Sequence, residues 1–226
     1  MTIKSFQIRT CLACGLRYPL VEGHTFGTRC PACLGETRLI LSRHLILEPA
    51  RNLPSTALIA RPSSTKREEL AVLLDNIRSA WNTGSIFRTA DGFGMTHIFL
   101  CGITPTPENE AVTRTSLGAE DSIPWSYHKD AVKLVKGLKK EGWKIYALEE
   151  KEGAKEILHA SRESGGKAVL ILGNEITGID PGLLDLCDEV YRIPMYGEKK
   201  SFNVAIAFGI AAFVMRKIQN DPSLAG

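Results

Sequence analysis

The 226-residue sequence lacks any run of about eighteen apolar residues free of charge, the length that a membrane-spanning helix needs. Its first residues, MTIKSFQIRT, lack the continuous apolar core of a secretory signal, so we expect a cytoplasmic protein with no membrane partner. Wholesale disorder is also excluded, because 44% hydrophobic and 23% charged residues are typical of a chain that buries a core. The length favours one main domain with a small appendage.

Most of the chain also lacks net charge. Of 28 bases and 25 acids in total, residues 1–48 hold six bases and three acids, which leaves 22 of each sign for the remainder. The positive excess therefore lies entirely in the N-terminal segment. That segment is the better candidate to contact a polyanion.

Four of the chain's six cysteines lie in that segment and form two Cys-x-x-Cys pairs, CLACG and CPAC, with fifteen residues between the pairs. This spacing predicts one structural zinc ion in a closed tetrahedral site. Gly15 can supply a positive φ after the first pair, and Pro31 stiffens the turn of the second. Two disulfides are the alternative, which a reducing compartment disfavours. The predicted ligands are Cys11, Cys14, Cys30 and Cys33.

His24 is a possible substitute ligand, although the four cysteines already complete the set. Cys101 and Cys187 have no partner at a ligand spacing and are expected to be buried as small apolar residues. We predict a zinc-ribbon-like RNA-binding module over residues 1–48, a linker over 49–66 with one short strand at TALIA, and a second domain over 67–226.

In the second domain, short apolar runs alternate with helical patterns. The runs LAVLLD, HIFLCG, WKIYALE, AVLILG and EVYRIP predict buried strands, and DAVKLVKGLKKEG predicts an amphipathic helix. This alternation predicts an α/β fold with a mostly parallel sheet, covered on both faces, that binds ligands at the carboxyl ends of its strands. Lys133, Lys136 and Lys140 on the helix are interpreted as a solvated face rather than a nucleic-acid site.

No G-x-G-x-x-G follows the first strand, where the chain reads NIRSAWNTGSIFRTADGFG, so a dinucleotide site is not expected at that turn. Glycines at strand ends cluster later, in LILGNEITGID and RIPMYGEKKSFN. Because glycine lets a backbone approach a ligand closely, we expect any adenosine-type ligand in the C-terminal half.

Three segments, NTGSIFRTADGFG, LILGNEITGID and IPMYGEKKSFNVAIA, resemble in order and spacing the three motifs of the SpoU (TrmH-like) branch of the SPOUT RNA methyltransferases. The resemblance covers about residues 70–219, includes TSLGAEDSIPW, and leaves out the cysteine module. It implies a C-terminal trefoil knot that holds S-adenosylmethionine, and methyl transfer to a ribose 2′-hydroxyl of tRNA or rRNA. It also implies a homodimer and no catalytic metal.

By this resemblance, five polar residues occupy catalytic positions. Arg88 corresponds to an arginine that contacts the target phosphate and helps to remove the 2′-hydroxyl proton, although arginine is a poor base by its reference pKa. Asn82 matches an asparagine that shapes the active site, with a helix N-cap as the alternative role. Glu175 matches the motif-two glutamate, with a surface loop as its alternative. Ser201 and Asn203 match the motif-three Ser-x-Asn, and Ser201 alternatively caps the last helix.

The resemblance also implies which residues hold the cofactor and the RNA. Gly173 and Gly178 match glycines that let the backbone approach the cofactor, and Phe202 stands where the family more often has leucine. Residues 193–195 match the segment that binds adenine, with a buried strand end as the alternative. The predicted cofactor-binding set is Leu172, Gly173, Asn174, Gly178, Ile193, Pro194, Met195, Ser201, Phe202 and Asn203. The predicted RNA-binding set is Arg88, Arg114, Lys199 and Lys200, of which the last three are otherwise solvated surface charges.

Two other functions stay open. A non-catalytic RNA-binding or ribosome-assembly factor would retain the knotted fold, but a dead enzyme is expected to have lost several of the five polar motif residues, and all are present. The second function is methylation of a base rather than a ribose. The match to all three motifs disfavours it. The sequence does not distinguish tRNA from rRNA as the substrate.

Overall fold

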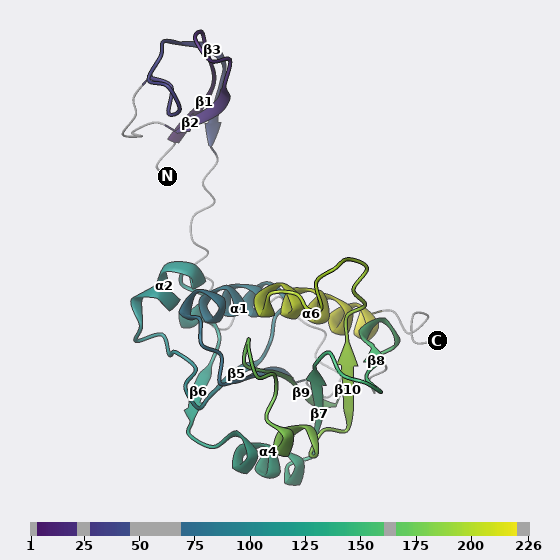
Figure 1. Ribbon diagram of the computed structural model, residues 1–226. Coiled ribbons are helices and arrows are strands. Elements are labelled where there is room, and N and C mark those ends of the chain that lie inside the picture. Colours follow the sequence, from purple (N-terminus) through teal and green to yellow (C-terminus); the bar gives the residue numbers. More distant parts are fainter. Residues whose placement is uncertain (1–3, 22–27, 46–68, 161–165, 221–226) are drawn as a thin grey trace. The chain divides into compact units, whose positions relative to one another are not determined.

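The structure, a computed structural model, describes residues 4–21, 28–45, 69–160 and 166–220 (Figure 1). The chain divides into two compact units, Met1–Arg61 and Pro62–Gly226. His24, the linker at 49–66 and the strand expected at TALIA lie outside the described residues, so these stay predictions, as do the domain boundaries. Within the described part of the chain, none of the helices combines the length and the hydropathy needed to cross a bilayer.

The N-terminal unit contains a three-stranded antiparallel sheet in the order β2-β1-β3. Its strands are β1 (Lys4–Cys11), β2 (Arg17–Val21) and β3 (Thr37–Leu45). The residue after each cysteine pair has a positive φ, +75° at Gly15 and +60° at Leu34. The first value confirms the expected role of Gly15, and the second shows that the other turn has the same form without a glycine.

The second unit contains a seven-stranded sheet in which every pairing is parallel, in the order β6-β5-β4-β9-β7-β10-β8. The five predicted strands are confirmed, and two short strands at the ends of the sheet were not predicted. The bounds are β4 (Glu69–Asp75), β5 (His97–Cys101), β6 (Trp125–His128), β7 (Trp143–Leu148), β8 (Lys155–Glu156), β9 (Lys167–Leu172) and β10 (Glu189–Arg192).

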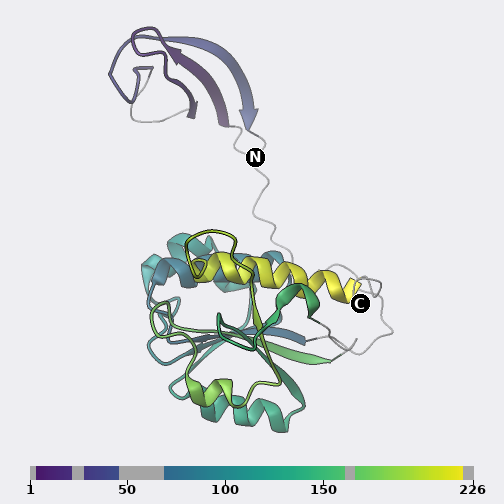
Figure 2. The same cartoon turned by 45° about the vertical axis from the view of Figure 1, so that its right-hand side comes forward.

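Helices cover both faces of this sheet, as predicted (Figures 1 and 2). Alternate residues of β4 point to opposite faces, so Leu70, Val72 and Leu74 belong to one apolar cluster and Ala71 and Leu73 to the other. The first cluster includes residues of α1 (Ala80–Gly92), α2 (Glu110–Ser116), α3 (Ala119–Ser122), α6 (Val204–Asn220) and the 3₁₀ turn Ile157–His159. The second includes α4 (Ala131–Lys140) and α5 (Pro181–Leu184).

The two unpaired cysteines of this unit are part of its interior. Cys101 is fully buried, as expected, and burial raises the pKa of its thiol to about 12. Cys187 is only half-buried, at the edge of the second apolar cluster, which includes α4, and burial raises the pKa of its thiol to about 11. Both thiols are therefore protonated at neutral pH and behave as small apolar groups.

Candidate active site

The carboxylate of Glu175, in the loop after β9, fastens that loop to the start of α1. Its two oxygens accept hydrogen bonds from the backbone nitrogens of Arg78 (2.9 Å) and Ser79 (3.2 Å) and from Asn82 Nδ2 (2.9 Å). Burial raises the pKa of this carboxyl, but the donors outweigh burial, so the pKa lies below its usual value. Glu175 is therefore ionised at neutral pH, where it also complements the positive end of the α1 dipole. Glu175 does lie in an exposed loop, as its alternative has it, but three hydrogen bonds fix its side chain there, and its catalytic position stays a prediction.

The amide of Asn82 links the first motif to both of the others. Its Nδ2 donates to Glu175, and its Oδ1 accepts a hydrogen bond from Asn203 Nδ2 at 3.0 Å. Asn203 in turn accepts from the backbone nitrogens of Ala205 (2.9 Å) and Ile206 (3.4 Å) through its Oδ1. One chain of side chains therefore joins Asn82 to two segments that lie 93 and 121 residues further along the sequence.

The two helix caps differ from the alternatives considered for these residues. Ser79 caps α1, because its hydroxyl accepts from the backbone nitrogen of Asn82 at 3.3 Å, so Asn82 lies inside the helix. Asn203 caps α6, so Ser201 does not. The capping role proposed as the alternative for Asn82 and for Ser201 is wrong. Ser201 is instead exposed in the loop before the helix.

The glycines of the second motif have a structural reason within their own loop. A Cβ on Gly173 would overlap the backbone of Gly178 and Ile179, and a Cβ on Gly178 would lie 2.7 Å from Glu149 Oε2. Gly178 also has a φ of +73°. The Glu149 carboxylate accepts a hydrogen bond from the Ile179 nitrogen at 2.8 Å and so draws the loop onto the end of β7. Both glycines are therefore needed to close this loop, whether or not a ligand is bound.

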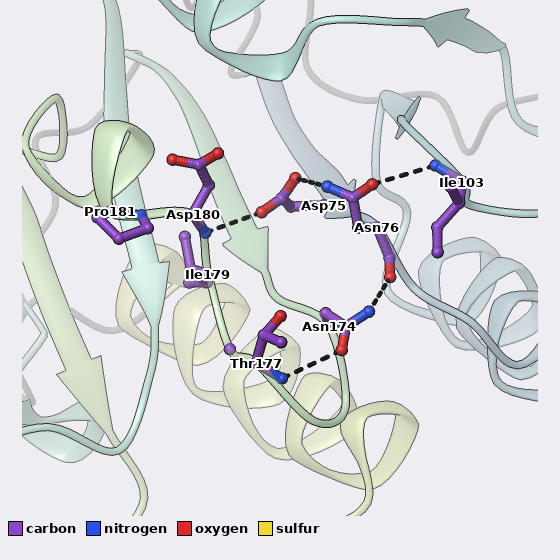
Figure 3. A pocket seen from close by; sticks show the side chains of 9 residues that line it. Asp75, Asn76, Ile103, Asn174, Thr177, Ile179, Asp180 and Pro181 are labelled. Atoms are coloured by element: carbon purple, nitrogen blue, oxygen red, sulfur yellow. Dashed lines mark hydrogen bonds between the residues drawn. The ribbon is translucent and has the colours of Figure 1, made fainter.

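A cavity of about 340 Å³ lies beside this loop, at the carboxyl ends of β4 and β9 (Figure 3). Asn174 Nδ2 donates to the carbonyl oxygen of Asn76 at 2.7 Å, and the Asp180 nitrogen donates to Asp75 Oδ2 at 3.0 Å. Asp75 also accepts from Asn76 Nδ2 (2.8 Å) and is only 2% exposed, and burial raises its pKa. Hydrogen bonds between polar groups of the cavity wall thus hold the loop after β9 against the loop after β4.

Asn174 is predicted to bind the cofactor, but all of its polar groups already make hydrogen bonds within or between these two loops. Its backbone exchanges two hydrogen bonds with Gly178, and its Oδ1 accepts from the nitrogens of Ile176 (2.9 Å) and Thr177 (3.1 Å). The structure therefore gives Asn174 a role in shaping the loop. Contact between Asn174 and a cofactor stays a prediction.

The other predicted cofactor residues lie where three neighbouring strands end together. In the sheet register, Leu148 at the end of β7 opposes Leu172 of β9 on one side and Tyr191 of β10 on the other. Gly173 directly follows β9, and half-buried residues 193–195 follow β10. Strand ends with apolar side chains and no Cβ at one position suit an adenosine group, which is apolar on its faces and hydrogen-bonds at its edge. Phe202 lies further along, before α6, and is 41% exposed.

The four predicted RNA-binding cations are all exposed, but they do not form one cluster of contacts. Arg88 lies on α1, and no hydrogen bond or ion pair joins its side chain to another of the described residues. Arg114 Nη2 pairs with Glu110 Oε2 at 2.7 Å, an exposed contact between residues four apart on α2. Lys199 and Lys200 lie in the loop between β10 and α6. Arg88, Lys199 and Lys200 are therefore free of partners among the described residues and can receive a phosphate, whereas Arg114 is already paired.

The four predicted cysteine ligands come together in the N-terminal unit. All four Sγ atoms lie within 4.8 Å of one another, with Cys11 and Cys33 at 3.4 Å and Cys14 and Cys30 at 3.7 Å. These distances are too long for disulfide bonds, which are about 2.0 Å, so the disulfide alternative is wrong. The Cys14 backbone nitrogen donates to Cys11 Sγ at 3.4 Å and lowers the pKa of that thiol to about 6. The cluster thus has the arrangement of a tetrahedral thiolate site.

Sequence reasoning missed four residues that hold the site together: Asp75, Asn76, Ser79 and Glu149. Asp75 and Glu149 each stand at or just after the end of an apolar strand, where polar residues of a parallel sheet gather. Ser79 stands three residues before Asn82, the spacing of an N-cap. Asn76 has a φ of +57°, which its neighbours in sequence do not predict.

Known proteins resemble the second unit. The profile of the SpoU rRNA Methylase family matches residues 69–213. A 23S rRNA (guanosine-2′-O-)-methyltransferase, RlmB, of Xylella fastidiosa is 32% identical over 65% of this chain and 57% of its own length. A tRNA (guanosine(18)-2′-O)-methyltransferase of Thermus thermophilus is 27% identical over 66% of this chain and 74% of its own.

A solved structure is similar at the same level. The AdoMet-bound rRNA methyltransferase of Sinorhizobium meliloti is 30% identical over 68% of this chain and 58% of its own, with a TM-score of 0.63. The chain therefore spans a little under three fifths of the RlmB relative's length, and the family profile begins after the four cysteines.

Proposed function

The chain belongs to the SpoU rRNA methylase family, and we propose that it is an S-adenosylmethionine-dependent methyltransferase that acts on a ribose 2′-hydroxyl of rRNA or tRNA. The observation that carries this proposal is the chain of hydrogen bonds from Glu175 through Asn82 to Asn203, because it unites the three predicted motifs. The names of the relatives support the ribose 2′-oxygen as the acceptor and leave rRNA and tRNA both open.

The cofactor, when bound, supplies an electrophilic methyl group. We assign its adenosine part to the ends of β9, β7 and β10, with Leu172, Gly173 and residues 193–195 around it and Phe202 closing one side. Ser201 and Asn203 stand just before α6, and residues 193–195 of the predicted adenosine site precede them closely in the chain. The part of Ser201 and Asn203 is to fix the position of the ribose, because orientation of the attacking oxygen supplies much of the rate in a direct displacement.

Glu175 acts in this scheme as a positioning residue. Its three hydrogen bonds fix the start of α1 and the amide of Asn82, whose orientation is set from both ends by Glu175 and Asn203. Arg88 then holds the phosphate beside the target ribose. A guanidinium group stays protonated at neutral pH, so we assign Arg88 to phosphate binding rather than to removal of the proton.

We further propose that the four-cysteine cluster binds one structural zinc ion. Sulfur atoms about 2.3 Å from a tetrahedral centre lie about 3.8 Å apart, close to the separations of the cysteine sulfurs. All four ligands come from the protein, so the site is closed and has no place for catalysis. The basic unit built on this ion would help to select or orient RNA.

A trefoil knot and a homodimer complete the proposal. Membership of the SpoU family supports the knot, because the resemblance to that family implies it. Exposed apolar side chains support the dimer: Ile206 and Phe213 of α6 and Trp81 of α1 are 57%, 52% and 62% exposed. A second copy would cover them. The cytoplasmic location of the protein stays a prediction.

Mapping of ribose methylation in total RNA tests the activity. RNA from a strain without this protein should lack at least one 2′-O-methyl group, and the purified full chain with S-adenosylmethionine should restore it. If no site disappears and the purified chain methylates neither rRNA nor tRNA from that strain, the proposed activity is wrong.

Arg88→Ala tests the assigned site. We expect methyl transfer to fall by about 10²-fold, the usual cost of one lost charged contact at a reacting centre, while binding of S-adenosylmethionine measured by calorimetry is unchanged. Lys136→Ala removes an equally exposed cation from α4, in the other helical layer, and should leave both quantities unchanged. Full transfer by Arg88→Ala would remove Arg88 from the site.

A further inference from the structure

One face of the three-stranded sheet is occupied by contacts within its own unit. It carries Gln7 and Arg9, because alternate residues of β1 point to opposite faces. Arg9 donates to Gln7 Oε1 at 2.6 Å and to Thr37 Oγ1 at 2.8 Å. Tyr18, directly opposite Arg9 in the register, donates through its hydroxyl to the carbonyl oxygen of Arg29 at 2.8 Å. This face thus supports the loop that carries the second cysteine pair.

The opposite face carries three exposed arginines. Arg17 of β2 and Arg38 of β3 both lie opposite Thr10 in the register, and Arg43 lies opposite Phe6. Directly opposed residues in antiparallel strands point to the same face, so all three share the face of Phe6. We call this surface the arginine face, and its main members are Phe6, Ile8, Arg17, Arg38, Leu41 and Arg43.

Apolar side chains separate the arginines of this face into two groups. Ile8 lies opposite both Pro19 and Leu41, and this row of residues crosses the middle of the sheet. Phe6 and Ile8 are half-buried and Leu41 is 39% exposed. Arg17 and Arg38 stand at one end of this apolar strip and Arg43 at the other. Cations thus flank a surface that can receive flat apolar groups.

The charge of the unit fits a polyanionic partner. Its described residues include six bases, and Glu36 is their one acid. Arg9, on the occupied face, is held by neutral side chains of its own unit. By contrast, within residues 4–21 and 28–45 no hydrogen bond or ion pair engages the side chains of Arg17, Arg38 or Arg43.

We propose that the arginine face binds a single-stranded segment of the RNA substrate, an inference that rests on the proposed function for making RNA the substrate. The three guanidinium groups contact phosphates, as arginine does in most RNA interfaces. Bases of the segment lie on Phe6 and Ile8, which only a strand with unstacked bases permits, because paired bases in a duplex hide their faces.

The test measures RNA binding by the full zinc-loaded chain rather than activity. The probe is a labelled single strand of about twelve nucleotides, within the range that one small domain covers, and its duplex serves for comparison. For the triple variant Arg17→Ala/Arg38→Ala/Arg43→Ala, we expect affinity to fall at least about tenfold. The slope of log affinity against log salt should fall by about two, because each lost phosphate contact on a single strand removes about 0.7.

Two further variants separate charge, stacking and folding. Phe6→Leu keeps an apolar side chain but removes the ring, so affinity should fall about fivefold with an unchanged salt slope. The matched control, Lys133→Ala/Lys136→Ala/Lys140→Ala, removes the same charge from the exposed side of α4 and should bind RNA as the wild type does. Zinc content equal to that of the wild type checks that each variant is folded.

An unchanged salt slope in the triple arginine variant, or duplex RNA bound by the wild type as tightly as the single strand, would overturn the proposal. Failure of the proposed function looks different. In that case the wild type would methylate no RNA. It would still bind the single strand, and the triple arginine variant would still bind that strand more weakly. Conversely, methylation by a triple variant that binds RNA normally would leave the function standing and remove the arginine face.

Discussion

The two units of the chain differ in what they bury. In residues 5–21 and 28–44, Cys11 and Cys30 are the only buried residues, at 2% and 0% exposure. The second unit has two apolar clusters, one on each face of its sheet, and β4 contributes to both with side chains that are fully buried. The described part of the first unit therefore has almost no hydrophobic core beyond its cysteines, while the second unit is stabilised by burial of apolar surface.

This difference means that the two units should respond to different perturbations. A small domain without a core needs a metal or disulfides to fold, and disulfides are absent from the described residues. The three tryptophans, Trp81, Trp125 and Trp143, all lie in the second unit. Tryptophan fluorescence therefore follows the unfolding of the second unit alone, and hydrogen exchange at β1–β3 follows the first.

Removal of zinc should have the largest effect. Structural zinc contributes about 10–16 kcal/mol of apparent folding free energy in small zinc peptides, far more than this unit can obtain from apolar burial. We expect a chelator, or Cys11→Ser/Cys30→Ser, to abolish protection of the β1–β3 amides from hydrogen exchange. The fluorescence-detected unfolding of the second unit should not change.

The matched control is Cys187→Ala, which removes a cysteine outside the cluster and should retain one zinc ion per chain. Persistent amide protection in β1–β3 after the zinc has been removed would contradict a metal-dependent unit. It would also show that the cysteines pack as ordinary apolar residues.

A core substitution in the second unit should destabilise that unit and leave the zinc-binding unit unchanged. Leu73 of β4 is fully buried in the α4 cluster, so Leu73→Ala should lower the free energy of unfolding of this unit by about 2–5 kcal/mol. The measurement is urea unfolding followed by tryptophan fluorescence. Leu158→Ala, at a position 62% exposed, should change it by less than about 0.5 kcal/mol. Loss of zinc from the Leu73→Ala chain would show that the units depend on each other.

The predictability of the two units also differs. The cysteine cluster followed from spacing alone, because both ligand pairs are local and the geometry of the metal does the rest. In the second unit, the strands that are buried on both faces were predicted from continuous apolar runs. The sequences WSYH of β6 and KE of β8 lack such runs, because strands at the ends of a sheet have fewer neighbours and less burial.

The candidate site could not be assembled from local patterns. Glu175 and Asn82 are 93 residues apart, and Asn82 and Asn203 are 121 apart. Only the resemblance to a family placed these residues together in advance. Their supports, such as Asp75 and Glu149, were missed because a carboxylate that accepts from a distant backbone nitrogen has no signature in sequence. The spacing of residues in the sequence predicts individual helices and strands. Hydrogen bonds between residues that are distant in sequence determine which strand ends lie together.

The smallest effect should come from Glu175, which belongs to neither core. Its pKa is lowered in the folded state by the donors of α1. The carboxylate therefore stabilises the fold at every pH above its unfolded pKa of about 4.3, and this contribution disappears as the pH falls through the lower folded pKa. Because Glu175 is exposed, Glu175→Gln should lower the free energy of unfolding at neutral pH by less than about 1 kcal/mol.

The pH dependence of that loss distinguishes a charge effect from a packing effect. Urea unfolding of the second unit should show a difference between wild type and Glu175→Gln that is constant at neutral pH and shrinks below about pH 4, where the wild-type carboxylate becomes protonated. Glu141→Gln, at an exposed acid directly after α4, should show no difference. A difference that persists unchanged into acid would mean that the shape of the glutamate, rather than its charge, holds the loop to α1.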